Sequence, residues 1–331
     1  MQRELSRAGE HAVAIAIALL ALFLITLLAR AAPPASPARQ ETDSGPMRIS
    51  VDVALVVLHA TVTDRQGSVV SNLGRQDFEV HENGVSQRIQ LFKNEDIPVT
   101  VGLVVDHSTT MERKLPEVTA AAQAFARSSN REDEMFVVNF NEKVSLGLPS
   151  TARFTNSAAE IERAIAAKPT EGETALYDAI AKGLEELQAG SRDKKVLIVV
   201  SDGGDNVSAH SLGEVMKLAE RSSAIIYTVG IFDQGDPDRN PGVLRRLAQA
   251  TGGEAFFPDQ LGEVVAICGR IARDIRHQYT IGYVPTNPAR DGVYRAIRVL
   301  AGANGHEKLS VRTRAGYVAG GEPRLDENVV K

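Results

Sequence analysis

Between residues 99 and 276 the chain alternates short apolar runs with segments of helical period, and this alternation constrains the fold more than any other feature. Apolar runs with few polar residues are typical of strands that are covered on both faces in a parallel sheet. Four such runs are expected as strands, at residues 99–105, 135–140, 196–200 and 224–229. The pattern predicts an α/β fold with a doubly wound, mostly parallel sheet, similar to a Rossmann fold.

Apolar residues three or four positions apart predict helices that bury one face. The clearest stripes are Leu115, Val118, Ala122 and Phe125; Leu176, Ile180, Leu184 and Leu187; and Val264, Ile267, Ile271 and Ile275. A further helix is expected to start at Pro241, capped by Asn240, and to stop at Gly252. Cys268, the one cysteine, lies on the last stripe, which predicts a buried, unreactive thiol and excludes an internal disulfide.

The segments that flank this region have the two-residue period of strands with one buried face. Before it, Ile49, Val51, Val53, Leu55 and Val57 alternate with other residues, and Asn83-Gly84 predicts a hairpin between the runs at 78–80 and 89–92. After it, residues 279–283, 294–300 and 309–313 are expected as strands. Neither flank suffices for a sandwich. We therefore predict that both pack together as one small β-sandwich-like domain, with the α/β domain inserted between them.

The N-terminus carries an apolar segment: positions 12–29 hold one polar residue, Thr26, and Arg3 and Arg7 precede them. This pattern predicts either a cleaved signal peptide or an uncleaved membrane anchor, so the rest of the chain is expected outside the cytoplasm, secreted, periplasmic or tethered. The expected segments are the signal or anchor (1–31), a Pro-rich linker (32–46), a β segment (47–97), the α/β domain (98–276), a second β segment (277–318) and a flexible tail (319–331).

Composition excludes some partners. The net charge is −5, there is no Trp, and aromatic residues make up 5% of the chain, so we expect no nucleic-acid binding. The chain has no Gly-x-Gly-x-x-Gly fingerprint and no Gly-x-x-x-x-Gly-Lys loop, which argues against a bound nucleotide.

Oxygen-bearing side chains follow the predicted strands at the points where they end. Asp106, Ser108 and Thr110 follow the first strand, Asp202 follows the third, and Thr174 precedes the helix between them. In an open α/β sheet, ligands bind at the carboxyl ends of the strands, so these five residues are expected at one edge. Oxygen donors with few carboxylates suit Mg²⁺, with Mn²⁺ or Ca²⁺ as alternatives, and disfavour Zn²⁺.

These motifs resemble the metal-ion-dependent adhesion site of a von Willebrand factor type A domain. The resemblance rests on Asp106-x-Ser108-x-Thr110, on Thr174 within Gly-Glu-Thr-Ala-Leu-Tyr-Asp, and on Asp202 within Ser-Asp-Gly-Gly-Asp-Asn. It covers residues 98–276, and the flanking segments resemble exported bacterial proteins of acidobacterial type. It implies that the hydroxyls of Ser108 and Thr110 ligate the metal directly. Thr174 would do so in one conformational state, and Asp106 and Asp202 would act through water.

The chain departs from the family pattern at Thr110, where Ser is usual, and the extra methyl group crowds the site. The resemblance also implies that the segment 261–276 shifts with the state of the metal, and that His107 points away from it. A competing interpretation of Asp106 and Ser108 is that they cap a helix starting near Lys114. Asp205 and Asn206 are expected to shape a turn rather than bind calcium, and Asp233 is expected in a solvated loop.

The expected function is adhesion: an Asp or Glu of a protein partner completes the coordination of the cation. No general base stands beside the predicted ion, so an enzyme is not expected. Two alternatives remain. The chain could be a periplasmic assembly subunit whose metal only holds the three loops together, or a Mg²⁺-dependent phosphoryl hydrolase, which would need a base that the motifs do not supply. The membrane is expected to be contacted only through the N-terminal segment.

Overall fold

The computed structural model describes residues 55–233, 239–302 and 309–320, which belong to one compact unit, Asp52–Lys331. The predicted signal or anchor and the linker lie outside the described residues. None of the helices that are described is at once long and apolar enough to cross a membrane.

A six-stranded sheet lies at the centre of the α/β domain, in the order β10-β9-β8-β5-β6-β7. Five strands are parallel, and β7 pairs antiparallel with β6 at one edge. The predicted mostly parallel sheet is therefore confirmed. Its strands are β5 (Val99–Asp106), β6 (Glu134–Phe140), β7 (Val144–Leu146), β8 (Lys194–Ser201), β9 (Ile225–Gly230) and β10 (Ala255–Phe256).

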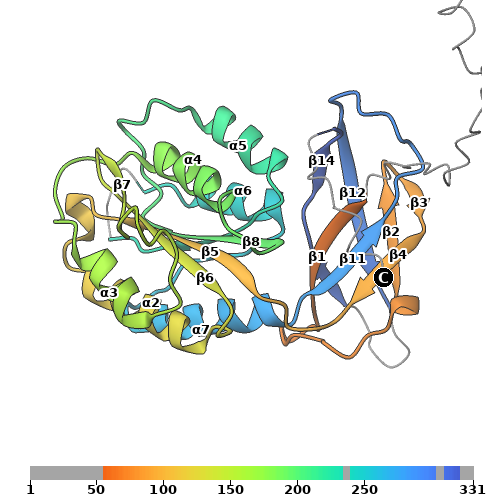
Figure 1. The fold of residues 1–331 in the computed structure, drawn as a ribbon, viewed down its shortest axis with the longest axis horizontal. Coiled ribbons are helices and arrows are strands. Elements are labelled where there is room, and N and C mark those ends of the chain that lie inside the picture. Colours follow the sequence, from red (N-terminus) through yellow and green to blue (C-terminus); the bar gives the residue numbers. More distant parts are fainter. Residues whose placement is uncertain (1–54, 234–238, 303–308, 321–331) are drawn as a thin grey trace, which may run out of the picture. The chain divides into compact units, whose positions relative to one another are not determined.

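Helices cover both faces of this sheet (Figure 1). One face carries α2 (Leu115–Ser128), α3 (Ala158–Ala166) and α7 (Glu263–Arg276), and the other carries α4 (Leu176–Leu187), α5 (Leu212–Arg221) and α6 (Pro241–Thr251). The four predicted apolar positions of α4 are all buried. Cys268 is buried on α7, and burial raises the pKa of its thiol to about 12, which agrees with an unreactive side chain. The helices α3 and α5 were not predicted.

Helix α6 begins and ends where the sequence predicts. The Asn240 side chain accepts a hydrogen bond from the backbone N–H of Val243 at 3.2 Å, and Pro241 is the first helical residue. Gly252 ends the helix at a φ of +84°. A side chain there would meet the backbone of Thr313 at 2.5 Å, so both the backbone angle and the close approach require glycine.

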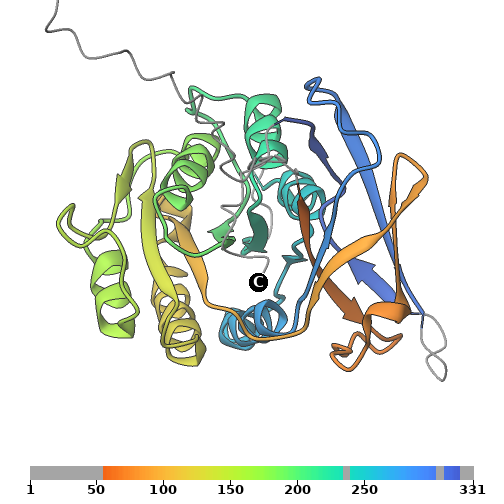
Figure 2. The same cartoon turned by 45° about the vertical axis from the view of Figure 1, so that its right-hand side comes forward.

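The flanking segments form two four-stranded antiparallel sheets, β13-β1-β11-β4 and β14-β12-β2-β3. Each sheet combines strands from both flanks, as Figure 2 shows, and the residues between the sheets form one apolar cluster. The two flanks complete each other, as predicted. The strands are β1 (Val56–Thr63), β2 (Phe78–Glu82), β3 (Val85–Gln87), β4 (Ile89–Lys93), β11 (Tyr279–Tyr283), β12 (Tyr294–Ala301), β13 (Ser310–Arg312) and β14 (Gly316–Val318).

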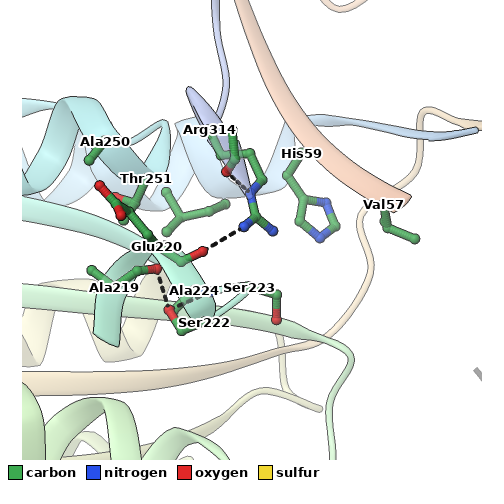
Figure 3. Close-up of a pocket in the computed structure, with 12 residues that line it drawn as sticks. Val57, His59, Ala219, Glu220, Ser222, Ser223, Ala224, Ala250, Thr251 and Arg314 are labelled. Carbon is green, nitrogen blue, oxygen red and sulfur yellow. Dashed lines mark hydrogen bonds between the residues drawn. The ribbon is translucent and has the colours of Figure 1, made fainter. Parts of the chain in front are cut away.

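The predicted buried face of β1 is wrong in its described part. Its even-numbered residues, from Val56 to Val62, are buried in the sandwich, whereas Val57 is half-buried. The reason is that the other face of β1 is also covered. There, Val57 and His59 line a small cavity together with Ala219 and Ala250 of the α/β domain (Figure 3). Because residues 55–58 are all apolar, the sequence there does not show whether the odd or the even positions face the core.

The predicted hairpin is also wrong in its second strand. Asn83 and Gly84 adopt positive φ values of 48° and 81° and join β2 to the short strand β3. The run at 89–92 instead forms β4, which pairs with β11 in the other sheet. The two-residue turn fixes only the residues nearest to it. One position beyond β3 the chain changes sheets, and Ile89 enters the same core from the opposite side.

The burial of Lys194, at the start of β8, can be tested through the pH dependence of the free energy of unfolding. Its side chain is 3% exposed and its Nζ donates to the carbonyl of Ile275, and burial lowers the pKa from 10.5 to about 7. Unfolded Lys194 therefore holds a proton between pH 7 and 10.5 that the folded protein has released. We expect this residue to make the free energy of unfolding rise with pH across that window, by at most about 1.4 kcal/mol per pH unit.

Urea unfolding at pH 7, 8 and 9 of the parent and of Lys194→Met measures this slope. We expect the variant to lack this rise, while the control Lys182→Met, at a partly exposed lysine, keeps it. Equal slopes in Lys194→Met and the parent would mean that Lys194 stays protonated in the folded protein.

Candidate metal-binding site

Asp106 is held in place more firmly than the exposed residue of the candidate site, Thr110. It ends β5, is fully buried, and accepts hydrogen bonds on both carboxylate oxygens. Its Oδ1 accepts the backbone N–H of Ser108 at 2.8 Å, and its Oδ2 accepts the hydroxyl of Ser201 at 2.6 Å. The first bond folds the residues after β5 into a tight turn, and the second ties that turn to the end of β8.

A continuous chain of oxygen atoms extends from this turn. The Ser108 hydroxyl lies 3.1 Å from that of Thr110, and the Thr110 hydroxyl donates to Oδ2 of Asp202 at 2.7 Å. Ser108 and Asp202 are buried, whereas Thr110 is exposed. Four of the five predicted residues therefore come together as one cluster, in which Thr110 is the exposed member.

Thr174 joins this cluster through its backbone. The loop before it is held to the β5 loop, because the N–H of Thr109 donates to the carbonyl of Gly172 at 3.3 Å. The N–H of Thr174 donates to the side chain of Asn206, four residues beyond Asp202. Among the described residues, the Thr174 hydroxyl forms no hydrogen bond with the other four. The structure therefore places Thr174 beside the loop of Asp202.

Two buried carboxylates, those of Asp106 and Asp202, lie within the cluster. Burial raises the pKa of Asp106 to about 6, and the nearby Asp202 carboxylate acts in the same direction. A cation bound here would offset this repulsion between carboxylates. Within the described part of the chain, no group of three or more His, Cys, Asp or Glu residues could hold a metal. A metal at this edge therefore depends on hydroxyl ligands, and the donors present fit a hard cation such as Mg²⁺.

The helix-cap interpretation of Asp106 and Ser108 is wrong. Ser108 precedes a short 3₁₀ helix (Thr109–Met111), but its side chain caps no backbone N–H. Helix α2 begins further on, at Leu115, and its N-cap position is Lys114. The polar atoms of Asp106 and Ser108 are instead used within the cluster and toward β8.

Sequence reasoning missed Lys114. Its side chain is 3% exposed, and Nζ donates to the carbonyl of Ile231 at 3.0 Å and pairs with Asp233 at 3.0 Å. This contact holds the end of β9 against the loop after β5, so Asp233 is ion-paired rather than simply solvated. A lysine next to a predicted helix start gave no signal of burial, because only the tertiary structure brings β9 beside it.

His107 is buried within the motif, and its Nε2 lies 3.1 Å from Oδ1 of Asn139 on β6. The Asn139 amide in turn donates to the carbonyl of Ala164 at 2.7 Å. Burial lowers the pKa of His107 and so favours the neutral ring, which links the site loop to β6 and α3.

Residues 100–267 match the model of the von Willebrand factor type A domain, over half of the chain. The chain belongs to this family. The family match agrees with the mostly parallel sheet and with the helices on both of its faces.

Two curated relatives are uncharacterized proteins. One, from Synechocystis, is 25% identical over 175 residues, which are 51% of this chain and 40% of the relative. The other, YfbK of Escherichia coli, is 22% identical over 238 residues, or 66% of this chain and 38% of the relative. The chain thus spans about two fifths of the length of these relatives.

Solved structures with similar chains include a von Willebrand factor type A protein from Catenulispora acidiphila, which is 13% identical with a TM-score of 0.49 and covers 81% of this chain and 73% of that one. The von Willebrand factor domain of the type V pili tip protein Mfa5 from Porphyromonas gingivalis is 14% identical with a TM-score of 0.46, covering 54% and 95%.

Proposed function

We propose that this family member acts outside the cytoplasm and binds a protein partner through a divalent cation, Mg²⁺ first and Mn²⁺ or Ca²⁺ as alternatives. The observation that carries this proposal is the unbroken chain of oxygen atoms from Ser108 through Thr110 to Asp202, with Asp106 behind it. The apolar segment at positions 12–29 supports export or tethering.

Each residue has a role in this proposal. The hydroxyls of Ser108 and Thr110 would ligate the cation, and Thr174 would add a third hydroxyl. Asp106 and Asp202 would supply negative charge, which at most neutralises a divalent ion. Bound there, the cation supplies an electrophilic centre that accepts a carboxylate oxygen. Thr110 lies at the surface beside exposed Thr109, so an Asp or Glu side chain of a partner can approach this hydroxyl.

Calorimetric titration of MgCl₂, MnCl₂ and CaCl₂ into the full chain, purified in a mild detergent, tests the metal site. We expect saturable binding with one cation per chain. Because a carboxylate completes the coordination, an excess of an Asp-containing peptide should tighten the binding of the metal, by about fivefold or more. The same peptide with Asn in place of Asp is the matched control and should have no effect.

The outcomes separate the candidate functions. Metal binding without any effect of the acidic peptide would favour the assembly subunit, in which the ion only holds the loops together. Absence of binding for all three cations, both with the peptide and without it, would contradict the proposal.

A further inference from the structure

Helix α4 has no cap of its own at its N-terminus. The N-cap position is Ala175, whose methyl side chain cannot accept a hydrogen bond. The N–H groups of the first turn bond to a distant loop instead. That of Tyr177 donates to the Asp205 carboxylate at 3.0 Å, and that of Asp178 donates to the Ser208 hydroxyl at 3.1 Å. The loop after β8 thus does what a local cap does in other helices.

The capping is reciprocal. The Asp178 carboxylate accepts the backbone N–H groups of Ala209 at 3.0 Å and His210 at 2.9 Å, and it also lies 2.7 Å from Nδ1 of His210. The start of α4 and the loop at 205–210 therefore satisfy each other's backbone groups. Neither segment can move away from the other without losing these hydrogen bonds.

Asn206 lies at the centre of this junction and holds Thr174 at two points. Its side-chain oxygen accepts the N–H of Thr174 at 2.9 Å, and its own N–H donates to the carbonyl of Thr174 at 3.0 Å. A third bond, from the N–H of Ala175 to the carbonyl of Asn141 at 2.8 Å, fixes the next residue. Asn206 itself is exposed, so its side chain is not part of the core.

We infer that Asn206 is a positioning residue that sets Thr174 against Asp202, an inference that rests on the proposed metal site. Asn206 and Asp202 belong to the same loop, and the backbone of Asp202 is itself fixed, because its carbonyl accepts the N–H of Asn240 at 3.1 Å. The hydrogen bonds from Asn206 therefore fix Thr174 relative to the Asp202 loop. This explains how a residue outside the β5 and β8 motifs is placed beside them.

A double-mutant cycle on Mn²⁺ affinity tests this role. The variants are Asn206→Ala, Thr174→Ala and the double variant of the full chain, each titrated with MnCl₂ by calorimetry. Loss of one hydrogen bond of this kind is expected to weaken Mn²⁺ binding about fivefold in Asn206→Ala. Because Asn206 acts through Thr174, adding Asn206→Ala to Thr174→Ala should weaken it no further.

Ser211→Ala is the matched control. Ser211 caps α5 through the N–H of Glu214 and lies at the end of the same loop, without contact to Thr174. We expect it to lower the thermal unfolding temperature of the metal-free protein as Asn206→Ala does, and to leave Mn²⁺ affinity unchanged. Asn206→Ser, which shortens the side chain and withdraws the acceptor, serves if the alanine variant does not fold.

The results distinguish the positioning role of Asn206 from the proposed metal-binding function on which it rests. An equal loss of affinity from Asn206→Ala in the parent and in Thr174→Ala would overturn the positioning role while the metal site stands. The same holds if Asn206→Ala binds Mn²⁺ as the parent does. Absence of Mn²⁺ binding by the parent would instead overturn the proposed function, and the inference with it.

Discussion

Replacing Asp106 with Asn is expected to weaken Mg²⁺ binding by at least about 100-fold while the metal-free protein stays folded and is at least as stable as the parent. At an effective dielectric of about 20, two unit charges about 4 Å apart interact by about 4 kcal/mol, so loss of one of two carboxylates costs a divalent cation much of its binding energy. Without the cation, the same change removes a buried charge, whose burial is the main reason that the pKa of Asp106 is raised, and with it the smaller repulsion from Asp202.

Calorimetry measures the affinity, and urea unfolding in EDTA measures the stability. An Asn side chain can still accept the N–H of Ser108 and can donate to Ser201, so the turn after β5 should persist. Asp106→Ala should abolish metal binding as well, but with a loss of stability from the two missing hydrogen bonds. If Asp106→Asn binds Mg²⁺ like the parent, or does not fold, Asp106 is a structural residue and the assignment of the site is wrong.

Replacing Arg312 with Ala is expected to lower the free energy of unfolding by about 3–5 kcal/mol. Arg312 on β13 pairs with Asp274 on α7 at 2.8 Å and with Glu254, which precedes β10. The Asp274 side chain is 3% exposed, so the variant leaves its charge buried without Arg312. Glu254 is affected less, because Arg270 also pairs with it at 2.9 Å.

Urea unfolding of Arg312→Ala beside the exposed control Arg298→Ala checks this value, and the control should change stability by less than about 0.5 kcal/mol. Adding Asp274→Asn to Arg312→Ala should restore part of the loss, since it removes the buried charge. A loss of less than about 1 kcal/mol in Arg312→Ala would show that water reaches Asp274 and that the network contributes little.

The sequence was informative about the α/β domain because its signals are local. Apolar runs such as that ending at Asp106 correspond to strands buried on both faces, and the α4 stripe is buried as its spacing predicts. The order of residues after β5 and β8 was enough to select the candidate donors, since parallel strands end at one edge. The same reasoning could not find Ser201 or Lys114, whose partners are distant in the chain.

The β segments show where local reasoning fails. The face that β1 buries depends on what covers its second side, and the cavity wall at Val57 and His59 comes from residues more than 150 positions away. The partner of β4 depends on a change of sheet one position beyond β3. The spacing of apolar residues indicates which residues can be buried, but not which sheet or domain covers them.

The sequence by itself determined the fold class and the oxygen-bearing residues of the candidate site, because both follow from residue types and short spacings. Only the tertiary structure decided how those donors meet. It sets the 2.7 Å bond from Thr110 to Asp202 and brings Thr174 to Asn206. It also closes the β sheets with strands from both flanks. The physical reason is that hydrogen bonds between distant loops depend on the packing of whole strands and helices, which no short pattern of residues encodes.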